Sequence, residues 1–259
     1  MVKLIVNLDI EAVCEIAKEA GKAILSVYDG DHAVEYKDDK SPLTAADKAS
    51  HEVIVAGLQK HFPEIPILSE EGADIPYEER KGWSRFWCVD PLDGTKEFIK
   101  RNGEFTVNIA LIENGRPVAG VVYVPARNTM YFGALEAGCW KLEEDNQPEK
   151  ITVRKADHEA GLTVVMSRSH PSPDLEAYLK DIKVAEAMPV GSSLKLCVVA
   201  EGLADLYPRL GPTMEWDTAA GHAVVEAAGG TVEQPNGEAL VYNKQDLLNP
   251  YFIVSGRLR

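Results

Sequence analysis

Apolar residues recur at helical spacing in two long stretches near the N-terminus. Between residues 9 and 27 they stand three or four positions apart, at Ile10, Val13, Cys14, Ala17, Ala20 and Ile24, which predicts an amphipathic helix. Residues 41–62 show the same spacing, with Thr44 as the expected N-cap and Asp47 three residues later, where a carboxylate favours the helix dipole. The following run, 65–72, predicts a short buried strand that ends in acidic residues.

The pattern changes to β-rich runs over residues 105–140. These runs are broken at Asn114-Gly115, Arg127-Asn128 and Ala137-Gly138. Because Asn-Gly between apolar runs is a strong hairpin signal, the region is expected to form an antiparallel meander. Residues 143–150 are the most polar, linker-like stretch of the chain. We therefore expect an N-terminal subdomain over 1–146 and a C-terminal subdomain over 147–259.

Beyond this stretch, short strands and helices alternate. The expected strands are 164–167, 184–190, 204–207 and the final 251–256, and the expected helices are 173–180, 192–200 and 216–228. Helices and antiparallel strands in both halves favour a layered α/β or α+β fold over a single doubly wound sheet.

The charge balance narrows the choice of ligands. The chain has 259 residues with 41 Asp and Glu against 27 Lys and Arg, a formal net charge of −14. Nucleic-acid binding needs clustered cations, and no Lys/Arg block occurs, so the composition argues against nucleic acid as a partner. A small phosphorylated substrate remains compatible with the acidic chain, provided that a bound divalent metal reverses the local field.

The sequence also predicts a cytoplasmic location. No apolar stretch approaches the roughly 18 residues of a membrane-spanning helix, and the N-terminus lacks the features of a signal peptide. The cysteines are widely scattered without a C-x-x-C pair, which predicts reduced structural thiols; they are Cys14, Cys88, Cys139 and Cys197. A peripheral association with the inner face of the membrane stays open.

Carboxylates stand at three places where an apolar element ends: Glu70-Glu71, Asp90 with Asp93, and Asp217. Taken alone, each has an ordinary explanation, respectively a solvated loop, a Pro-Asp-Gly turn and a carboxylate in the first turn of a helix. These explanations do not account for the fact that an acidic residue directly follows an apolar element at all three places. The joint pattern favours a metal site.

The segment DPLDGT (90–95) suits such a site best. Pro91 holds Asp90 extended, and a turn after it would let Asp90, the Leu92 carbonyl and Asp93 converge on one point. Carboxylate and carbonyl oxygens are the ligands that Mg²⁺ prefers. A helix opened by Gly94-Thr95 would offer free N–H groups to an anion such as phosphate.

These segments resemble the inositol monophosphatase superfamily of Mg²⁺-dependent, lithium-sensitive phosphatases. The resemblance rests on DPLDGTKEF (90–98), WDTAAGHAVVEAAGG (216–230) and LSEEG (68–72). Lys96-Glu97 replaces the Thr-Asn of typical inositol monophosphatases, and SRSHPSPDL (167–175), GSSLKLC (191–197) and YPRLGPTMEWDTAAG (207–221) are similar to the CysQ branch of 3′(2′),5′-bisphosphate nucleotidases. The likeness runs from about Ala12 to Ser255. It implies a layered αβαβα sandwich with the active site between two subdomains.

The resemblance also implies roles for single residues. Two or three Mg²⁺ ions would be held by carboxylates and one main-chain carbonyl, those of Glu70, Asp90, Leu92, Asp93 and Asp217, with Glu71 as the second acid of the family's pair. Gly94 and Thr95 would hold the scissile phosphate through backbone N–H groups. Thr95 and Asp47 would orient and deprotonate the attacking water. Glu70 would also take part in catalysis, and Glu70, Leu92, Asp93 and Asp217 would line the substrate site.

The implied reaction is hydrolysis of the 3′-phosphate of adenosine 3′,5′-bisphosphate, a by-product of sulfate assimilation, to AMP and phosphate. Li⁺ would inhibit it, and the enzyme would be a monomer or homodimer without a stable partner protein. Another small phosphoester, such as inositol phosphate, is the nearest alternative; a non-catalytic metal- or phosphate-binding module is the alternative from another class. Lys195 either faces the second phosphate or ribose or is solvated, Arg209 is a further candidate for that contact, and His222 either supports the site or packs in its helix.

Overall fold

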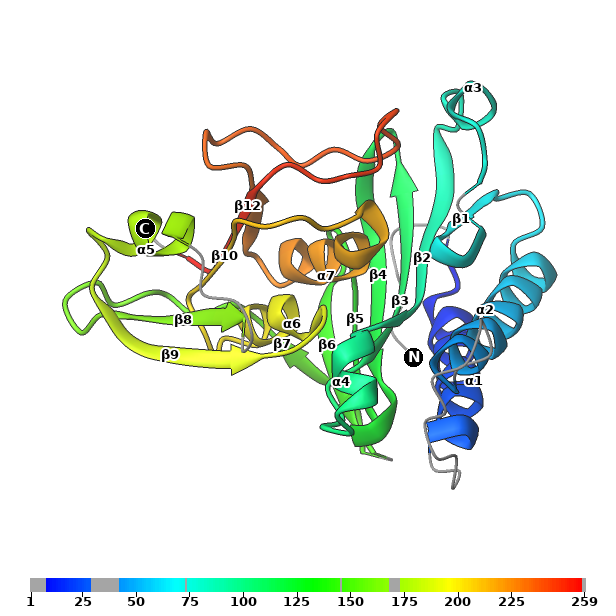
Figure 1. The fold of residues 1–259 in the computed structure, drawn as a ribbon, viewed down its shortest axis with the longest axis horizontal. Helices are drawn as coiled ribbons and strands as arrows, with labels where there is room; N and C mark the ends of the chain where they lie inside the picture. The colour runs from blue at the N-terminus through cyan, green and yellow to red at the C-terminus, as the bar shows by residue number, and fades with distance from the viewer. Residues whose placement is uncertain (1–7, 29–41, 73, 145, 168–172, 258–259) are drawn as a thin grey trace.

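The computed structural model describes residues 8–28, 42–72, 74–144, 146–167 and 173–257 (Figure 1). Its strands form two sheets, one with the sequential order β1 to β7 and one with the order β11-β12-β10-β8-β9. The strands are β1 (Ile67–Ser69), β2 (Arg85–Asp93), β3 (Thr106–Glu113), β4 (Arg116–Val124), β5 (Thr129–Ala134), β6 (Gly138–Glu143), β7 (Glu149–Ile151), β8 (Leu162–Ser167), β9 (Val184–Val190), β10 (Leu206–Arg209), β11 (Thr231–Glu233) and β12 (Phe252–Ser255). The helices are α1 (Ile10–Tyr28), α2 (Pro42–His61), α3 (Tyr77–Arg80), α4 (Thr95–Ile99), α5 (Pro173–Leu179), α6 (Leu194–Ala200) and α7 (Glu215–Ala227), with single 3₁₀ turns η1 (Glu70–Gly72) and η2 (Pro125–Arg127).

The elements stack in five layers. Helices α1 and α2 cover one face of the seven-stranded sheet, and α7 covers the other (Figure 1). Helix α6 packs against α7 and also contacts β8, β10 and β12, so these two helices lie between the sheets. Tyr178 and Leu179 of α5 pack against the five-stranded sheet at Leu162, Val164 and Leu206. The resulting order confirms the predicted αβαβα sandwich.

Both faces of the seven-stranded sheet are buried, because helices lie on each side. In β2, Trp87 and Val89 pack toward α1 and α2, whereas Phe86 and Cys88 pack toward α6 and α7. Alternate residues of a strand point to opposite faces, so a strand covered on both sides is apolar throughout. This is why β2 and β3 appear in the sequence as continuous apolar runs.

The first half of the fold follows the predicted pattern, with one error at a helix terminus. Helix α1 matches the expected amphipathic helix, and β3 to β6 form the expected antiparallel meander. Asn114 and Gly115 both have positive φ, as a tight hairpin turn requires. The predicted N-cap at Thr44 is wrong, because α2 begins two residues earlier at Pro42, and proline is well suited to the first turn of a helix since it lacks an N–H that would go unpaired.

The second half follows the predicted alternation with shifted ends. The helix expected from Ser192 begins at Leu194, because Ser192 has a φ of 45° and interrupts helical geometry. The strand expected over 204–207 is β10 at Leu206–Arg209. The three-residue strands β7 and β11 were not predicted, since each is defined by its partner in the sheet rather than by its own pattern.

The division of the chain at residue 146 stays a prediction. Strand β7 continues the seven-stranded sheet to Ile151, and α7 from the C-terminal part covers that sheet. All four cysteines are free and buried, as expected of structural thiols. Within the described residues, no helix has the length and apolar character needed to cross a membrane.

Candidate active site

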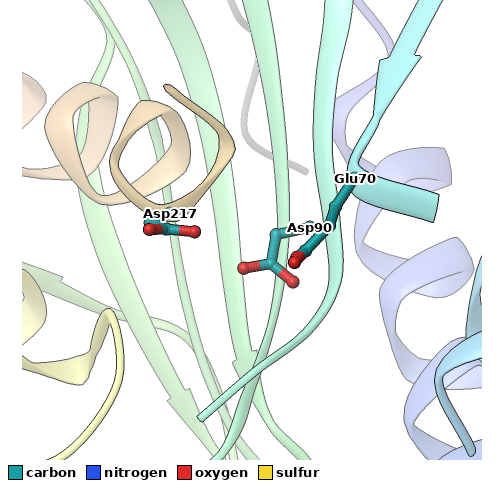
Figure 2. Close-up of side chains that lie close together, drawn as sticks. All are labelled: Glu70, Asp90 and Asp217. Carbon is teal, nitrogen blue, oxygen red and sulfur yellow. The ribbon is translucent and has the colours of Figure 1, made fainter. Parts of the chain in front are cut away.

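Three carboxylates from distant parts of the chain meet at one end of α7. Glu70 follows β1 in η1, Asp90 lies in β2, and Asp217 lies in the first turn of α7. One carboxylate oxygen from each lies within 4.8 Å of the other two (Figure 2). Strands β1 and β2 are parallel neighbours and α7 packs on β2, so the fold itself brings these side chains together. Their metal-binding role stays a prediction.

A β-bulge shapes the segment between Asp90 and Asp93. Asp90 pairs with Asn108 and Asp93 with Thr106, so β2 contains one more residue than β3 between the same pairs. The segment is therefore a bulged strand, not the turn that the sequence suggested at this point. The chain leaves the strand at Gly94, whose φ of 98° is in the left-handed region.

The bulge is fixed from both sides by hydrogen bonds. The Leu92 N–H donates to Asp90 Oδ1 at 3.0 Å. The buried Ser50 hydroxyl of α2 donates to the Pro91 carbonyl at 2.7 Å. Ser50 lies one helical turn after Asp47 in α2. The hydrogen bond from Ser50 to the bulge therefore also keeps the Asp47 carboxylate close to the acidic cluster.

Burial and mutual repulsion raise the pKa values of the clustered acids. The pKa of Asp90 lies well above its usual range, chiefly because of burial and then because of the charges of Asp93 and Glu70. Burial and the charge of Asp93 raise the pKa of Asp217 to about 7. For Glu70, burial and then the charges of Asp93 and Glu71 raise the pKa. The protein alone therefore does not favour the fully ionised cluster.

The donor set fits a hard divalent cation. Asp90 Oδ2 and Asp47 Oδ1 are buried and have no hydrogen-bond partner among the described residues. Buried carboxylates without partners are costly unless a cation compensates them. An all-oxygen set of closely spaced carboxylates is the kind that Mg²⁺ binds.

Asp47 lies beside the cluster, next to the acidic pair that follows β1. Burial, the charges of Glu71 and Glu70, and a hydrogen bond to Glu71 raise its pKa to about 8. Thr95 is exposed at the first position of α4, and α2 contacts α4. The predicted pairing of Asp47 with Thr95 requires this proximity and stays a prediction.

A small cavity of about 80 Å³ adjoins the carboxylates. Its lining includes two carboxylates, those of Asp93 and Asp217, and two cations, those of Lys195 and Arg209. The Lys195 ammonium lies 5.9 Å from the centre of the Tyr207 ring. Burial lowers the pKa of Lys195, and the charge of Asp93 opposes this effect. The sequence left two alternatives for Lys195, a side chain that faces the substrate or one that is solvated. Its place in the lining of this cavity favours the first.

Arg209 lines the cavity, whereas His222 is buried within α7. Arg209 donates from Nη2 to the Pro212 carbonyl at 2.8 Å, while its buried Nε has no partner among the described residues. His222 is buried in α7, where its Nδ1 lies 2.9 Å from the Tyr242 hydroxyl and its Nε2 lies 3.4 Å from Glu226. These contacts favour the packed histidine over a partner of the acidic cluster.

Sequence reasoning missed the contact that joins Asp93 to α6. The Ser193 N–H donates to Asp93 Oδ2 across 100 positions of the chain. Ser193 also shares its hydroxyl with Thr106 and Asn108. Polar residues at alternate positions in the otherwise apolar run 105–112 were the available signal.

Residues 7–256 match the profile of the inositol monophosphatase family. The chain belongs to this family. A relative in Salmonella typhimurium named 3′(2′),5′-bisphosphate nucleotidase CysQ is 54% identical over 250 residues, which cover 95% of this chain and 99% of the relative.

Solved structures from the inositol monophosphatase family agree with this assignment. The crystal structure of CysQ from Bacteroides thetaiotaomicron has a TM-score of 0.89 at 46% identity, covering 99% of this chain and all of the other. An inositol monophosphatase from Zymomonas mobilis has a TM-score of 0.80 at 25% identity, covering 98% of this chain and 94% of the other. The predicted family and fold are therefore confirmed.

Proposed function

We propose that the protein is a Mg²⁺-dependent phosphomonoesterase that hydrolyses the 3′-phosphate of adenosine 3′,5′-bisphosphate to AMP and phosphate. The observation that carries the proposal is the cavity whose lining brings together Lys195, Arg209, Asp93 and Asp217. Such an arrangement offers carboxylates for a metal at one phosphate and cations for a second phosphate. The name of the 54% identical relative supports the same substrate class.

The proposed metal ligands are Glu70, Asp90, Asp93, Asp217 and the main-chain carbonyl of Leu92, for two or three Mg²⁺ ions. When bound, Mg²⁺ supplies positive charge to the phosphoryl and leaving oxygens and acidifies water. The carboxylates set where that charge lies. The ionised cluster is unfavourable without a cation, which supports an obligatory dependence of activity on metal.

The remaining roles belong to the start of α4 and to α2. The backbone N–H groups of Gly94 and Thr95 hold the scissile phosphate. The Thr95 hydroxyl accepts a hydrogen bond from the attacking water, and Asp47 accepts the proton that Thr95 passes on. Asp47 lies next to Glu70 and Glu71, so a cation bound at this acidic pair would favour the ionised carboxylate, which is the form that can accept a proton.

We also propose that the enzyme acts as a cytoplasmic monomer or homodimer, and that Li⁺ inhibits it. Sizing by light scattering with and without Mg²⁺ distinguishes the two assemblies. Fractionation of cells into cytosol and membrane tests the location.

The decisive experiment measures phosphate release from adenosine 3′,5′-bisphosphate and inositol 1-phosphate side by side, with Mg²⁺, with EDTA and with added Li⁺. We expect strong preference for the nucleotide, loss of activity in EDTA and inhibition by Li⁺. Preference for inositol 1-phosphate would retain the metal chemistry and overturn the substrate. The absence of Mg²⁺-dependent release from both would contradict the proposed reaction.

A substitution tests the water-activating pair. Thr95→Ala removes the hydroxyl and keeps the backbone N–H of α4. We expect kcat to fall by about 10²–10⁴-fold, the range that a positioned acid–base group contributes, while Mg²⁺ binding persists. Unchanged hydrolysis would refute the role of Thr95.

A further inference from the structure

Three buried polar residues alternate just before and within the start of β3. Glu104, Thr106 and Asn108 are almost fully inaccessible to solvent. The residues between them, Phe105 and Val107, belong to the core against α1 and α2. Because successive side chains of a strand point to opposite faces, the three polar residues face the α6–α7 side, where the acidic cluster lies.

All three residues bind the segment Gly191–Ser193, just before α6. Glu104 Oε2 accepts the Gly191 N–H at 2.8 Å, and the Glu104 carbonyl accepts the Ser192 hydroxyl at 2.5 Å. The Ser193 hydroxyl lies 2.8 Å from Thr106 Oγ1 and 2.7 Å from Asn108 Oδ1. An amide oxygen can only accept, so Ser193 donates to Asn108 and in turn accepts from Thr106.

The same segment joins the two halves of the candidate site. Its Ser193 N–H donates to Asp93 Oδ2, and Lys195 follows two residues later in the first turn of α6. In the sheet, Thr106 is the register partner of Asp93. Strand β3 is thus connected, through one three-residue segment, to a carboxylate and a cation that both line the cavity.

The segment has little freedom to move. A Cβ atom added to Gly191 would come within 2.5 Å of the Glu97 side chain and 3.0 Å of Glu104 Oε2. Ser192 has a left-handed φ of 45°, which its two hydrogen bonds with Glu104 and Leu194 help to maintain. Arg127 binds the other oxygen of Glu104 at 3.0 Å and fixes that carboxylate.

We propose that Glu104, Thr106 and Asn108 are positioning residues that set the spacing between Asp93 and Lys195. This inference rests on the proposed function, because the spacing matters for a substrate with one phosphate at the metal and a second at Lys195. The three residues touch neither phosphate; they act through Ser193. They make the enzyme selective for a bisphosphate over a monophosphate.

The physical basis is the sensitivity of a closed polar site to small displacements. Thr106→Val keeps the size of the side chain but removes the donor to Ser193, which leaves a buried oxygen short of a partner. Ser193 then loses its fixed position, and so do its N–H toward Asp93 and the start of α6. Misplacement of such groups by about 1 Å can reduce reactivity by about 10²-fold.

The test compares Thr106→Val with Thr106→Ser, which retains the hydroxyl, and with the matched control Thr231→Val. Thr231 Oγ1 forms a hydrogen bond of 2.9 Å to Ser255 in the other sheet, so the control removes a hydroxyl–hydroxyl contact far from the site, at an exposed residue. Calorimetry measures Mg²⁺ binding without substrate. Kinetics give KM and kcat for adenosine 3′,5′-bisphosphate and for adenosine 3′-phosphate.

We expect Thr106→Val to weaken Mg²⁺ binding and to raise KM for the bisphosphate, each by about five- to twentyfold, the effect of a lost buried hydrogen bond and its consequences. With Mg²⁺ at saturating concentration, KM for the monophosphate should change less than about threefold, and Thr106→Ser should resemble the wild type. Glu104→Gln, which keeps the shape of its side chain, should act in the same direction and serves if Thr106→Val does not fold.

The proposal is overturned if folded Thr106→Val and Glu104→Gln match Thr231→Val in Mg²⁺ affinity and in both KM values. Lower thermal stability alone, with unchanged binding, would mean a purely structural role and also overturns it. Wild-type protein without phosphatase activity would refute the proposed function instead. In that case the Mg²⁺ affinities of the Thr106 variants still decide whether β3 positions Asp93.

Discussion

At the scale of single residues, the acidic cluster that we propose for catalysis lowers the stability of the metal-free protein. Asp90 is buried, repelled by Asp93, Glu70 and Asp217, and its Oδ2 has no partner among the described residues. Asp90→Asn keeps the acceptor for the Leu92 N–H and removes the charge. In EDTA we expect the variant to be more stable by about 1 kcal/mol, which raises Tm by about 2–4 °C.

The same substitution should remove most of the activity. A charge aimed at the reaction centre typically contributes about 10²–10³-fold to kcat. Thermal melts in EDTA and phosphate release with Mg²⁺ measure the two effects. A less stable variant in EDTA would contradict the repulsion that we infer, whereas full activity would exclude Asp90 as a ligand.

Protonation of the cluster predicts how stability depends on pH. Without metal, the pKa of Asp47 rises from 3.8 to about 8 and that of Asp217 to about 7. Between these values and 3.8 the folded state binds more protons than the unfolded state, so stability falls as pH rises through this window. In EDTA we expect a lower Tm at about pH 8.5 than at about pH 5.5.

With Mg²⁺ bound, we expect stability to rise with pH instead of falling. The cation binds the deprotonated carboxylates and neutralises the charge that protons neutralise at lower pH. The gain in Tm on adding Mg²⁺ is therefore expected to be larger at about pH 8.5. Asp217→Asn should flatten the pH dependence measured in EDTA. A Tm in EDTA that increases over this range would contradict the raised pKa values.

At the scale of elements, the junction of β2 and α4 depends on Gly94. Its φ is +98°, and an added Cβ would come within 3.1 Å of Ser192 Cβ and 3.2 Å of Phe105 Cα. Gly237 has a similar φ of +83° with nothing within 4 Å of an added Cβ. A comparison of substitutions at these two glycines therefore separates the effect of backbone strain from the effect of close packing.

Gly94→Ala should cost more than the control Gly237→Ala. We expect about 1–2 kcal/mol for the left-handed conformation in both, and a further loss of activity of about 10²-fold in Gly94→Ala, because the phosphate-binding N–H groups shift. Chemical denaturation and kcat/KM measure the difference. Equal activity of the two variants would place the phosphate away from α4.

Elements with a strong pattern of their own could be predicted, and elements defined by partners could not. The stripe of α1 and the turn at Asn114-Gly115 are local signals, and both were predicted correctly. The start of α2 was misplaced because Thr44 looked like a cap while Pro42 already opens the helix. The short strand β7 exists through its pairing with β6.

The same distinction holds for the site. Glu70, Asp90 and Asp217 were expected together because each follows a buried element, and the fold brings their oxygens within 4.8 Å. The Ser193–Asp93 contact joins residues 100 positions apart. It depends on how the middle helices dock between the sheets, which no local pattern encodes.

At the scale of the molecule, one core joins the N-terminal sheet to the C-terminal helices. Phe86, Ala110 and Val122 of the seven-stranded sheet lie in one buried cluster with Leu196 of α6 and Val224 of α7. A fragment ending at residue 146 would expose this face and would also lack β7. Apolar area contributes about 25 cal/mol per Å² buried, so the loss of one whole face of the sheet exceeds the marginal stability of a domain.

We therefore expect the fragment 1–146 not to fold alone, even though the polar stretch 143–150 suggests a boundary. Circular dichroism should show no cooperative thermal transition, and near-ultraviolet signals of the buried Trp87 should be absent. Addition of the fragment 147–259 should restore both signals and, with Mg²⁺, phosphate release, because Asp217 and Lys195 then rejoin Asp90 and Asp93. A cooperative melt of 1–146 by itself would show that α1, α2 and six strands suffice, and that the C-terminal part contributes the active site without being needed for the core.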